Sequence, residues 1–323
     1  MKILRNVLII TECLVIVFLG FILLTSNEMN RNIIEKLGYR VSSDIKDNSI
    51  IAKSIDENLV VDTKDYILCD NPYEEEVINK SDNGIYKFKE LTIDGVEAYM
   101  LIVYDAANVK MMVSPAFNTK DNSGKERIKA MTERYGALAG VNGGGFYDDG
   151  KTSKDIPMGY VIKDGEILWD YKNGRKGLII GFSNDNKLMM LENVTGKEAV
   201  EQGMRDGLEF GPVLMREGVI TEESKQPRWA GRASRVMLAQ REDGIVIMLA
   251  TNGGTVGGAR MSKILEELQK YNVYNIANLD GGASAQMVVE GTLYTHVRSA
   301  TGNFVQGGRL VVNGWGVFAP EKN

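Results

Sequence analysis

The segment Arg235–Thr251, RVMLAQREDGIVIMLAT, contains two apolar runs that are separated by a short polar turn. The runs are Arg235–Gln240 and Gly244–Thr251. Two apolar runs of this length on either side of a glycine-containing turn are typical of a β-hairpin. We therefore predict a hairpin at this point of the chain.

Further strands are predicted on both sides of this hairpin, together with a few helices. A Thr-x-x-Glu pattern at Thr195–Glu198 predicts the start of one helix, and apolar residues at helical spacing predict a second helix at Ser262–Tyr271. Because strands outnumber helices, we expect an α+β domain with a mixed, largely antiparallel β-sheet and flanking helices. The predicted strands are Ala98–Tyr104, Lys110–Ser114, Ala137–Asn142, Gly159–Lys163, Glu166–Asp170 and Ile276–Leu279.

The N-terminal residues Val7–Leu24 are almost wholly apolar. A helix of about 18 residues is roughly 27 Å long, which is close to the hydrocarbon thickness of a bilayer. Lys2 and Arg5 precede this run, so the positive-inside tendency keeps the N-terminus in the cytoplasm. We expect residues 1–26 to form a single-pass membrane anchor, with the rest of the chain outside. A cleaved signal peptide is the alternative, although no A-x-A-like cleavage site follows the run.

The chain after this apolar run changes character twice. Residues 27–85 are polar and irregular, with an acidic run at Glu74–Glu76, and they predict a stalk or a small membrane-proximal segment. Residues 86–323 contain the predicted strands and helices. We expect this third part to be one folded domain.

The composition excludes several classes of function. The net charge is −5 and no dense Lys/Arg cluster occurs, so no nucleic-acid partner is expected. The two cysteines, Cys13 and Cys69, cannot form a disulfide framework or a multi-cysteine zinc site. The single histidine, His296, alternates with apolar residues and is predicted to lie on an edge strand. We expect no metal and no cofactor, and chemistry carried by carboxylates, arginines, amides and backbone dipoles.

Three glycine-rich loops follow strand ends, and none of them fits a dinucleotide-binding or P-loop pattern. Glycine allows a backbone to approach a ligand closely, and successive N–H groups can form an anion-binding nest. Any one loop can be a simple turn, but three loops beside Asn or Asp favour a shared site. The loops are Asn142–Tyr147 with Gly143 and Gly144, Asn252–Gly254, and Asn278–Ser284.

Three charged residues at strand ends are the sharpest candidates for chemistry. Asp280 ends an apolar strand and begins a Gly-Gly turn, which places a carboxylate at the sheet edge, facing a pocket. A turn-capping aspartate is the alternative. Arg235 begins one apolar strand and Arg309 precedes another. A planar guanidinium at such a position suits bidentate binding of phosphate or carboxylate, although either arginine can equally be a structural ion-pair partner.

On these residues the sequence resembles the phosphodiester glycosidase family, over about residues 86–320. This family includes the uncovering enzyme, which removes N-acetylglucosamine from a sugar phosphodiester. The resemblance implies hydrolysis of a sugar-1-phosphodiester at the anomeric C–O bond. We expect the substrate to be a cell-envelope glycan or an exopolysaccharide. The blocks that carry it are RASRVMLAQ at 232–240, NLDGGAS at 278–284, NGGGFY at 142–147, FGPVL at 210–214 and GRLVVN at 308–313.

Two departures from the family's usual pattern bear on the choice of substrate. Ala283 and Ala285 stand where the family often has Gly and Ser, and Asn252–Gly254 stands where it often has Asp-Gly-Arg.

The resemblance also implies roles for individual residues. A phosphate is a good leaving group, so arginines and backbone N–H groups can stabilise it without a general acid. Asp280 would activate water or stabilise the oxocarbenium-like centre, and Arg235 would bind the phosphate. Asn142 and Ser284 would orient the substrate, with Arg309 assisting.

Other interpretations stay open. Glu209 and Asp148 are the candidates if a second acid is required. A different class of function is a non-catalytic carbohydrate-binding or cell-envelope assembly module that keeps the pocket. A metal-dependent phosphoesterase using Asp148, Asp149 and Asp280 with Ca²⁺ or Mg²⁺ is less favoured, because no clustered acidic ligand motif is visible.

Overall fold

The computed structural model describes residues 71–80, 83–115, 124–147, 156–170, 173–255 and 257–321. The chain divides into two compact units, Met1–Asn79 and Lys80–Asn323. The described part of the first unit contains the helix α3 (Pro72–Ile78). The predicted membrane anchor and residues 27–70 of the predicted stalk lie outside the described residues. Within the described residues, no helix has the length and apolar character needed to span a membrane.

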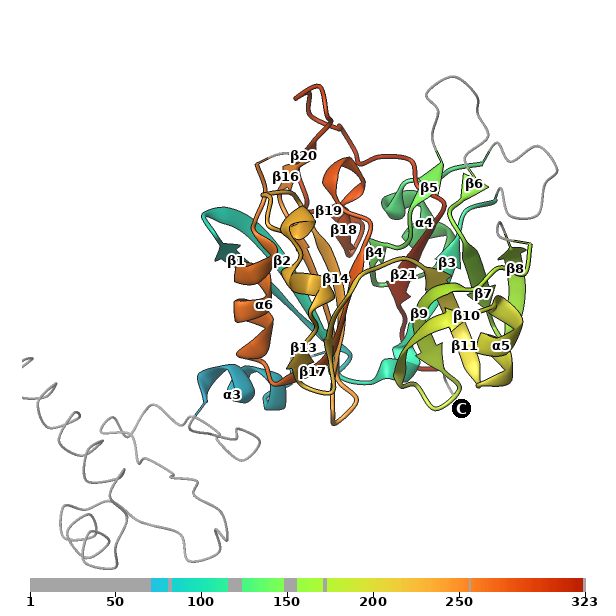
Figure 1. The fold of residues 1–323 in the computed structure, drawn as a ribbon. Helices are drawn as coiled ribbons and strands as arrows, with labels where there is room; N and C mark the ends of the chain where they lie inside the picture. Colours follow the sequence, from blue (N-terminus) through green and yellow to red (C-terminus); the bar gives the residue numbers. More distant parts are fainter. Residues whose placement is uncertain are drawn as a thin grey trace, which may run out of the picture. The chain divides into compact units, whose positions relative to one another are not determined.

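A seven-stranded antiparallel sheet contains the predicted hairpin at its centre (Figure 1). The hairpin strands β14 and β15 are buried along their whole length. Helix α6 (Met261–Gln269) buries Ile264, Leu265 and Leu268 and contacts the edge strand β1. In sheet order the strands are β1 (Tyr86–Ile93), β2 (Val96–Val103), β15 (Val246–Thr251), β14 (Val236–Arg241), β17 (Val273–Leu279), β12 (Val213–Arg216) and β13 (Val219–Ile220).

Two five-stranded sheets complete the main β-structure. The first is β10 (Leu188–Val194), β9 (Gly177–Ser183), β11 (Met204–Glu209), β7 (Tyr160–Lys163) and β8 (Glu166–Asp170), with helix α5 (Gly196–Glu201) beside it. The second is β19 (Thr292–Leu293), β18 (Met287–Val289), β4 (Ala139–Asn142), β21 (Asn313–Val317) and β3 (Val109–Val113), with helix α4 (Ile128–Tyr135) beside it.

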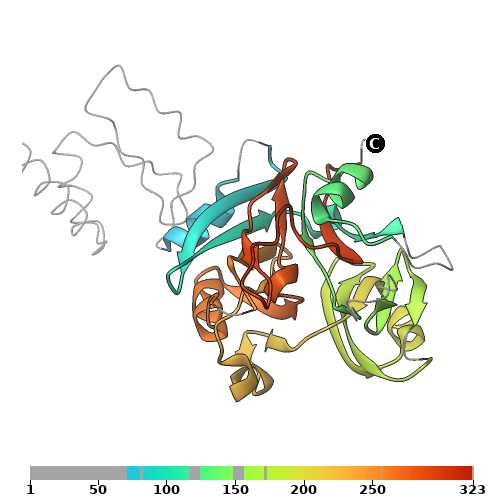
Figure 2. The ribbon, with the colours of Figure 1, turned by 90° about the horizontal axis from the view of Figure 1, so that it is seen from above.

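Short elements connect these sheets. The pair β5 (Phe146–Tyr147) and β6 (Ile156–Pro157) is antiparallel, and the pair β16 (Gly253–Gly254) and β20 (Val297–Arg298) is parallel. Figure 2 shows the yellow-to-gold connection after β11 passing from a five-stranded sheet to the seven-stranded sheet. The 3₁₀ turns are η1 (Ala106–Asn108), η3 (Glu223–Lys225), η4 (Pro227–Trp229) and η5 (Gly282–Ser284).

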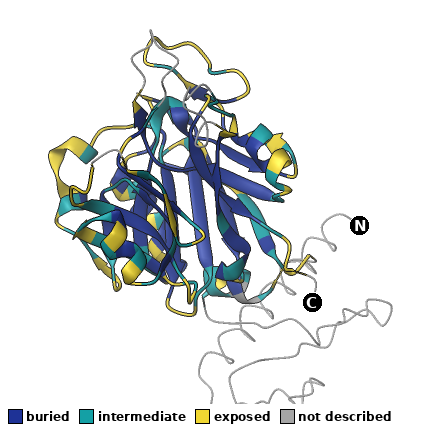
Figure 3. Ribbon diagram, turned by 90° about the vertical axis from the view of Figure 1, so that its right-hand side faces the viewer, coloured by how far each residue is buried: buried dark blue, intermediate teal, exposed yellow. Residues whose placement is uncertain are grey.

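The three larger sheets bury one shared hydrophobic core (Figure 3). Leu238 and Ala277 come from the seven-stranded sheet, Phe182 from one five-stranded sheet and Trp315 from the other. The Phe182 and Trp315 rings meet edge to face with their centres 5.4 Å apart. Burial of aromatic side chains of this size contributes strongly to stability. The sheets of this unit are therefore held together by one core.

The prediction of a largely antiparallel α+β domain is confirmed. The turn at Asp164 and Gly165, between two of the predicted strands, has positive φ at both residues, as a type I′ hairpin turn requires. The Thr195–Glu198 pattern forms a capping box at the start of α5. The prediction of one sheet with flanking helices was wrong in part. The β-structure is divided among several sheets and the helices are few and short, because most strands pack on other strands instead of on helices.

Candidate active site

Asp280 and Arg235 lie at the same end of two neighbouring strands. Val236 of β14 pairs with Leu279 of β17 in antiparallel register. Arg235 is the residue before Val236, and Asp280 is the residue after Leu279. The two charged residues therefore stand side by side where the ladder ends. The structure therefore places the backbones of the predicted acid and the predicted arginine at the same end of the ladder.

The Gly-Gly turn after Asp280 is fixed against the start of β14. Gly282 N donates to Ser234 O at 2.9 Å, and Ser234 Oγ donates to Gly282 O at 2.6 Å. A Cβ added to Gly281 would lie 2.5 Å from Ser234 O, closer than real Cβ atoms come to another atom. Glycine is thus needed here for the close approach of two backbones. The turn keeps Asp280 and Arg235 in register.

Asn142 holds Asp280 from the other side. Its Nδ2 donates to Asp280 O at 2.7 Å, and its Oδ1 accepts from Gln286 N at 2.8 Å. Asp280 N donates to Gly143 O at 2.9 Å. Asn142 is only 1 % exposed, so its amide is used within the protein. The structure shows Asn142 as a residue that positions Asp280, and the predicted substrate contact stays a prediction.

The backbone of Gly143 and Gly144 is bound to Asn313. Gly143 N donates to Asn313 O at 3.0 Å, and Gly144 N donates to Asn313 Oδ1 at 2.8 Å. A Cβ on Gly143 would overlap the Asn313 side chain. Both N–H groups therefore already have an acceptor within the protein, and the predicted substrate contact of Gly143 and Gly144 stays a prediction. The two glycines allow the loop to pack closely beneath Asp280.

Asp280 has an unusual carboxyl group. Partial burial raises its pKa to about 6, although a hydrogen bond from Ser284, the charge of Arg309 and the Gly281 N–H each lower it. Ser284 is buried, and its Oγ accepts from Arg309 Nη1 at 3.2 Å. The Arg309 guanidinium also lies 4.8 Å from the centre of the Phe146 ring. Arg309, Ser284 and Asp280 therefore form one chain of polar contacts.

Arg235 is half-buried, and no counter-charge meets it in the described part of the chain. Among the described residues no hydrogen-bond acceptor meets its buried Nε, and no carboxylate pairs with its guanidinium. Nη2 reaches Gly231 O only at 3.5 Å, and the guanidinium carbon lies 5.7 Å from the centre of the Trp229 ring. Loss of water lowers the pKa of Arg235. Because buried charges in proteins are normally paired, this cation is suited to an anionic ligand.

Asn252 follows Thr251, which bonds Arg235, and its side-chain amide is hydrogen-bonded within the protein. Its Nδ2 donates to Glu97 Oε2 at 2.8 Å, and its Oδ1 accepts from His296 N at 2.7 Å. Thr251, the preceding residue, bonds Arg235 N through its Oγ1 at 2.9 Å. His296 is exposed in the connection before β20, so the prediction of an edge-strand position was wrong. Asn252 is placed to hold the β15 end in position.

A cavity of about 750 Å³ lies beside these residues. Neither Asp280 nor Arg235 lines it, but its wall is hydrogen-bonded to β17. Asn278 N donates to Pro212 O at 3.0 Å and Asn278 Nδ2 to Gly211 O at 2.9 Å, while Trp229 touches both the cavity and Arg235. The lining residues are Met158, Gly159, Leu178, Glu192, Glu209, Phe210, Gly211, Pro212, Val213, Thr221, Glu223 and Trp229.

The two candidates for a second acid have different outcomes. Glu209, at the end of β11, lines the cavity. Asp148 and Asp149 lie outside the described residues.

Sequence reasoning missed Trp229. The signal for it was a tryptophan in a polar, proline-containing segment just before the Arg235 block. In the described part of the chain, no group of three or more His, Cys, Asp or Glu side chains is arranged to hold a metal ion.

The chain that carries this site belongs to the phosphodiester glycosidase family. The model of that family matches residues 135–318. The predicted family is confirmed. A search of curated proteins found no significant match.

Three solved structures have a similar fold. The catalytic domain of zebrafish N-acetylglucosamine-1-phosphodiester α-N-acetylglucosaminidase, auto-inhibited by its pro-peptide, has 21% identity and a TM-score of 0.59, covering 75% of this chain and 86% of that chain. A hypothetical protein from Synechocystis has 14% identity and a TM-score of 0.53, with coverages of 73% and 62%. A putative exported protein from Burkholderia pseudomallei K96243 has 14% identity and a TM-score of 0.51, with coverages of 69% and 74%. At these identities the likeness shows the fold.

Proposed function

We propose that this protein hydrolyses the bond between the anomeric carbon and the phosphate oxygen of a sugar-1-phosphodiester. Its substrate would be a cell-envelope glycan or an exopolysaccharide. The observation that carries the proposal is the half-buried guanidinium of Arg235, which has no counter-charge among the described residues. Arg235 precedes β14 at the end of the ladder where Asp280 follows β17. Membership of the phosphodiester glycosidase family supports the same reaction class.

In the proposed reaction Arg235 binds the phosphate and Asp280 acts in its ionised form. The anomeric C–O bond breaks, and its electron pair leaves with the phosphate monoester, whose charge Arg235 stabilises. Water supplies the new bond to the anomeric carbon and gives a proton to Asp280. The carboxylate also stabilises the positive charge that develops on the sugar. A good leaving group makes a second carboxylic acid unnecessary.

Isotope labelling tests which bond breaks. The full-length protein is incubated with methylumbelliferyl phosphodiesters of several sugars in water enriched in ¹⁸O. The proposal expects the label on the anomeric oxygen of the released sugar and none on the phosphate. Label on the phosphate would instead show P–O cleavage and a phosphoesterase. Binding of these compounds without any turnover would favour the non-catalytic carbohydrate-binding or envelope assembly module.

We also propose that the domain lies on the outer side of the cytoplasmic membrane. The support is the apolar run Val7–Leu24 preceded by Lys2 and Arg5. Protease added to intact spheroplasts should digest the domain, with a cytoplasmic protein as the protected control. Full protection of the domain until the membrane is lysed would contradict this location.

A further inference from the structure

Gln286, the residue before β18, is fully buried and is bonded to the three polar residues around Asp280. Its Nε2 donates to Arg309 O at 2.9 Å and to Ser284 O at 3.3 Å. Its backbone N donates to Asn142 Oδ1 at 2.8 Å, and its carbonyl oxygen accepts from Asn142 N at 3.4 Å. The residues that hold Asp280 in place or act on its charge are therefore linked through this one glutamine.

The side chain of Gln286 is itself held in place. Its Oε1 accepts from Ile128 N, at the start of helix α4, at 3.2 Å. A Cβ added to Gly308 would overlap this oxygen, and Gly308 has φ of +83°, which also favours glycine. The loop before Arg309 can therefore pass close to the amide. Because the side chain is buried and both atoms of its amide are used within the protein, Gln286 is suited to positioning other residues.

The two residues that Gln286 holds through its side chain act on the carboxyl group of Asp280. Ser284 donates a hydrogen bond to this group and Arg309 supplies a positive charge, and both lower its pKa against the effect of burial. Arg309 Nη1 also donates to Ser284 Oγ at 3.2 Å. The charge and the hydroxyl group therefore reach Asp280 together.

The other groups around Asp280 act differently. Arg235 precedes the neighbouring strand β14, and Asn142 contacts the backbone carbonyl of Asp280. The Gly281 N–H lowers the pKa of Asp280 but belongs to the same backbone turn. In the described part of the chain, Arg309 is the charged residue that lowers this pKa. Its displacement would leave the effect of burial largely unopposed.

We propose that Gln286 is a positioning residue of the active site, which holds Ser284 and Arg309 against Asp280 so that the carboxylate is ionised when it acts. This inference rests on the proposed function, because that reaction uses the ionised form of Asp280. Gln286 acts through the two residues that it holds. Without its amide, their backbones lose the donor that keeps them in place, and the carboxyl group keeps its proton to a higher pH.

Gln240 is a matched control for Gln286. It is also buried, and it lies near the end of β14 that is far from Asp280. Its Oε1 accepts from Leu188 N at 2.7 Å, and its Nε2 donates to the carbonyl oxygens of Asn186 at 2.8 Å and Gly244 at 3.0 Å. Each glutamine thus accepts one backbone hydrogen bond and donates two. A change to methionine removes the same set of bonds in both places, so the loss of stability should be similar.

The pH profile of kcat/KM tests the proposal in the full-length protein, with a methylumbelliferyl sugar phosphodiester as substrate. In the wild type the rise should be half complete at about pH 6, the pKa of Asp280. Gln286→Met should move this midpoint to about pH 7, so that kcat/KM falls about fivefold at pH 6 and less than about twofold at pH 8. Gln240→Met should keep the wild-type midpoint. An unchanged midpoint in a folded Gln286→Met protein would overturn the assignment.

Two glycine variants disturb the same amide without changing it. Gly308→Ala places a Cβ against Gln286 Oε1 and should also move the midpoint upward. Gly307→Ala is the matched control, because Gly307 has a positive φ in the same loop and its added Cβ would come no closer than 3.4 Å to another residue, at Arg127 Nε. Equal midpoints in the two variants would contradict the positioning role, and this comparison decides the matter if Gln286→Met does not fold.

Unfolding separates this inference from the proposed function. The pH dependence of the unfolding free energy reports the pKa of Asp280 without turnover, when each protein is compared with its Asp280→Asn derivative. The stability contributed by the protonated group is lost as pH rises through about 6 in the wild type, and should be lost at higher pH in Gln286→Met. If this shift occurs but no phosphodiester is hydrolysed, the proposed hydrolysis fails and the positioning role stands. If hydrolysis occurs with equal midpoints in Gln286→Met and Gln240→Met, the positioning role fails and the hydrolysis stands.

Discussion

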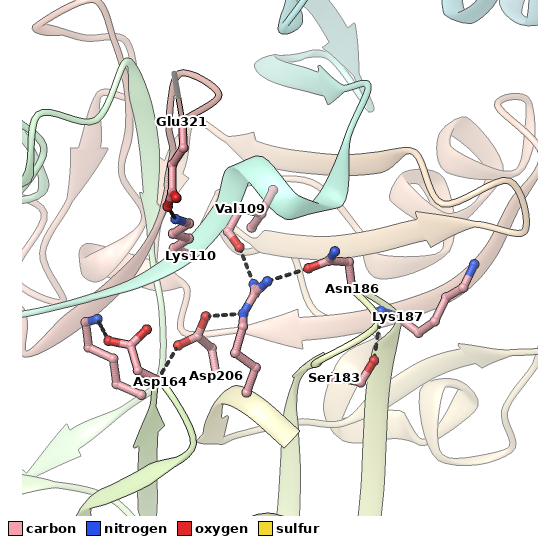
Figure 4. A network of polar contacts seen from close by, with 10 residues as sticks. Val109, Lys110, Asp164, Ser183, Asn186, Lys187, Asp206 and Glu321 are labelled. Carbon is pink, nitrogen blue, oxygen red and sulfur yellow. Dashed lines mark hydrogen bonds and ion pairs between the residues drawn. The ribbon is translucent and has the colours of Figure 1, made fainter. Parts of the chain in front are cut away.

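Two arginines of this domain, Arg205 and Arg235, are both partly buried and have opposite surroundings. Arg205 donates to Asp206 Oδ2 at 2.9 Å, to Asn186, and to Val109 O at 2.5 Å (Figure 4). Its acceptors come from three different parts of the chain. Arg235 has neither a carboxylate nor a good acceptor among the described residues. The guanidinium of Arg205 therefore has its acceptors within the fold, whereas that of Arg235 does not have them among the described residues.

The difference shows how the same side chain serves stability in one place and ligand binding in another. A partly buried cation with its acceptors in place connects elements of the fold. A partly buried cation without acceptors destabilises the fold, because it has lost its hydrogen bonds to water and has formed none with the protein. Burial also raises the pKa of Asp280 to about 6, although Ser284, Arg309 and the Gly281 N–H offset part of the effect. We expect substitutions of Arg235 or Asp280 to impair activity, and substitutions of Arg205 or Asp206 to impair stability.

The largest expected difference is between two aspartates. Asp280→Asn keeps the size of the side chain and removes its charge, so kcat should fall by about 10³-fold with little change in substrate binding. Asp206→Asn weakens the Arg205 contact, so the free energy of unfolding should fall by about 1–3 kcal/mol while kcat stays within about twofold. Kinetics on a sugar phosphodiester and urea unfolding measure the two effects. A folded Asp280→Asn protein with near-normal kcat would contradict the assigned role.

The arginines should differ in the sign of their effect on stability. Arg235→Met replaces an uncompensated cation with an apolar side chain of similar length, and should leave the unfolding free energy unchanged or raise it by about 1 kcal/mol. Arg205→Met leaves Asp206 buried without its arginine partner and should lower the unfolding free energy by about 2–4 kcal/mol. Urea unfolding without phosphate in the buffer measures both. An equal loss of stability in the two variants would show that Arg235 is also a structural residue.

The pH dependence of rate and stability gives a smaller effect. The proposed mechanism uses ionised Asp280, so kcat/KM should rise about tenfold per pH unit below pH 6 and level off above it. Because the folded-state pKa is raised, the stability contributed by the protonated group is complete below the unfolded-state pKa near 4. It is lost as pH rises through about 6. Asp280→Asn should remove both dependences. A rate that is flat between pH 5 and 7 would contradict the assignment.

The smallest expected effect concerns the support of Arg235. Asp94, in the turn between β1 and β2, pairs with Arg232 at 2.8 Å and with Arg260 at 2.6 Å. Arg232 is three residues before Arg235, so these pairs help to hold that segment in place. Asp94→Asn should raise KM by a few fold and change kcat less. Glu217→Gln, on an exposed turn beyond β12, is the matched control and should change neither. A fall in kcat with an unchanged KM would argue against a positioning role.

Much of the fold and part of the site could be predicted from the sequence. Asp280 and Arg235 were found because each stands where an apolar run meets a turn, and antiparallel pairing of their strands then places them side by side. The internal hydrogen bonds of Gly143 and Gly144 could not be predicted, because they depend on a non-local contact. Asn313, far along the chain, accepts their N–H hydrogen bonds, and no local pattern reveals that pairing.

The cavity could not be predicted for the same reason. Its wall combines Met158, Glu209 and Trp229 from segments that are far apart in the sequence. That Arg235 meets no carboxylate among the residues that the structure describes is also a property of the folded chain, because a sequence does not show which charges meet. Local periodicity therefore predicts strands and their ends, and long-range pairing decides which side chains remain available to a ligand.

Binding of a sugar 1-phosphate tests the central contrast between the two arginines most directly. Calorimetric titration of the full-length protein compares the wild type with Arg235→Met and Arg205→Met, each at a temperature well below its unfolding transition. We predict that Arg235→Met weakens binding by at least about 50-fold, as expected for loss of a charge-assisted contact to phosphate, and that Arg205→Met changes it less than about threefold. Equal affinity in the wild type and Arg235→Met would contradict the account.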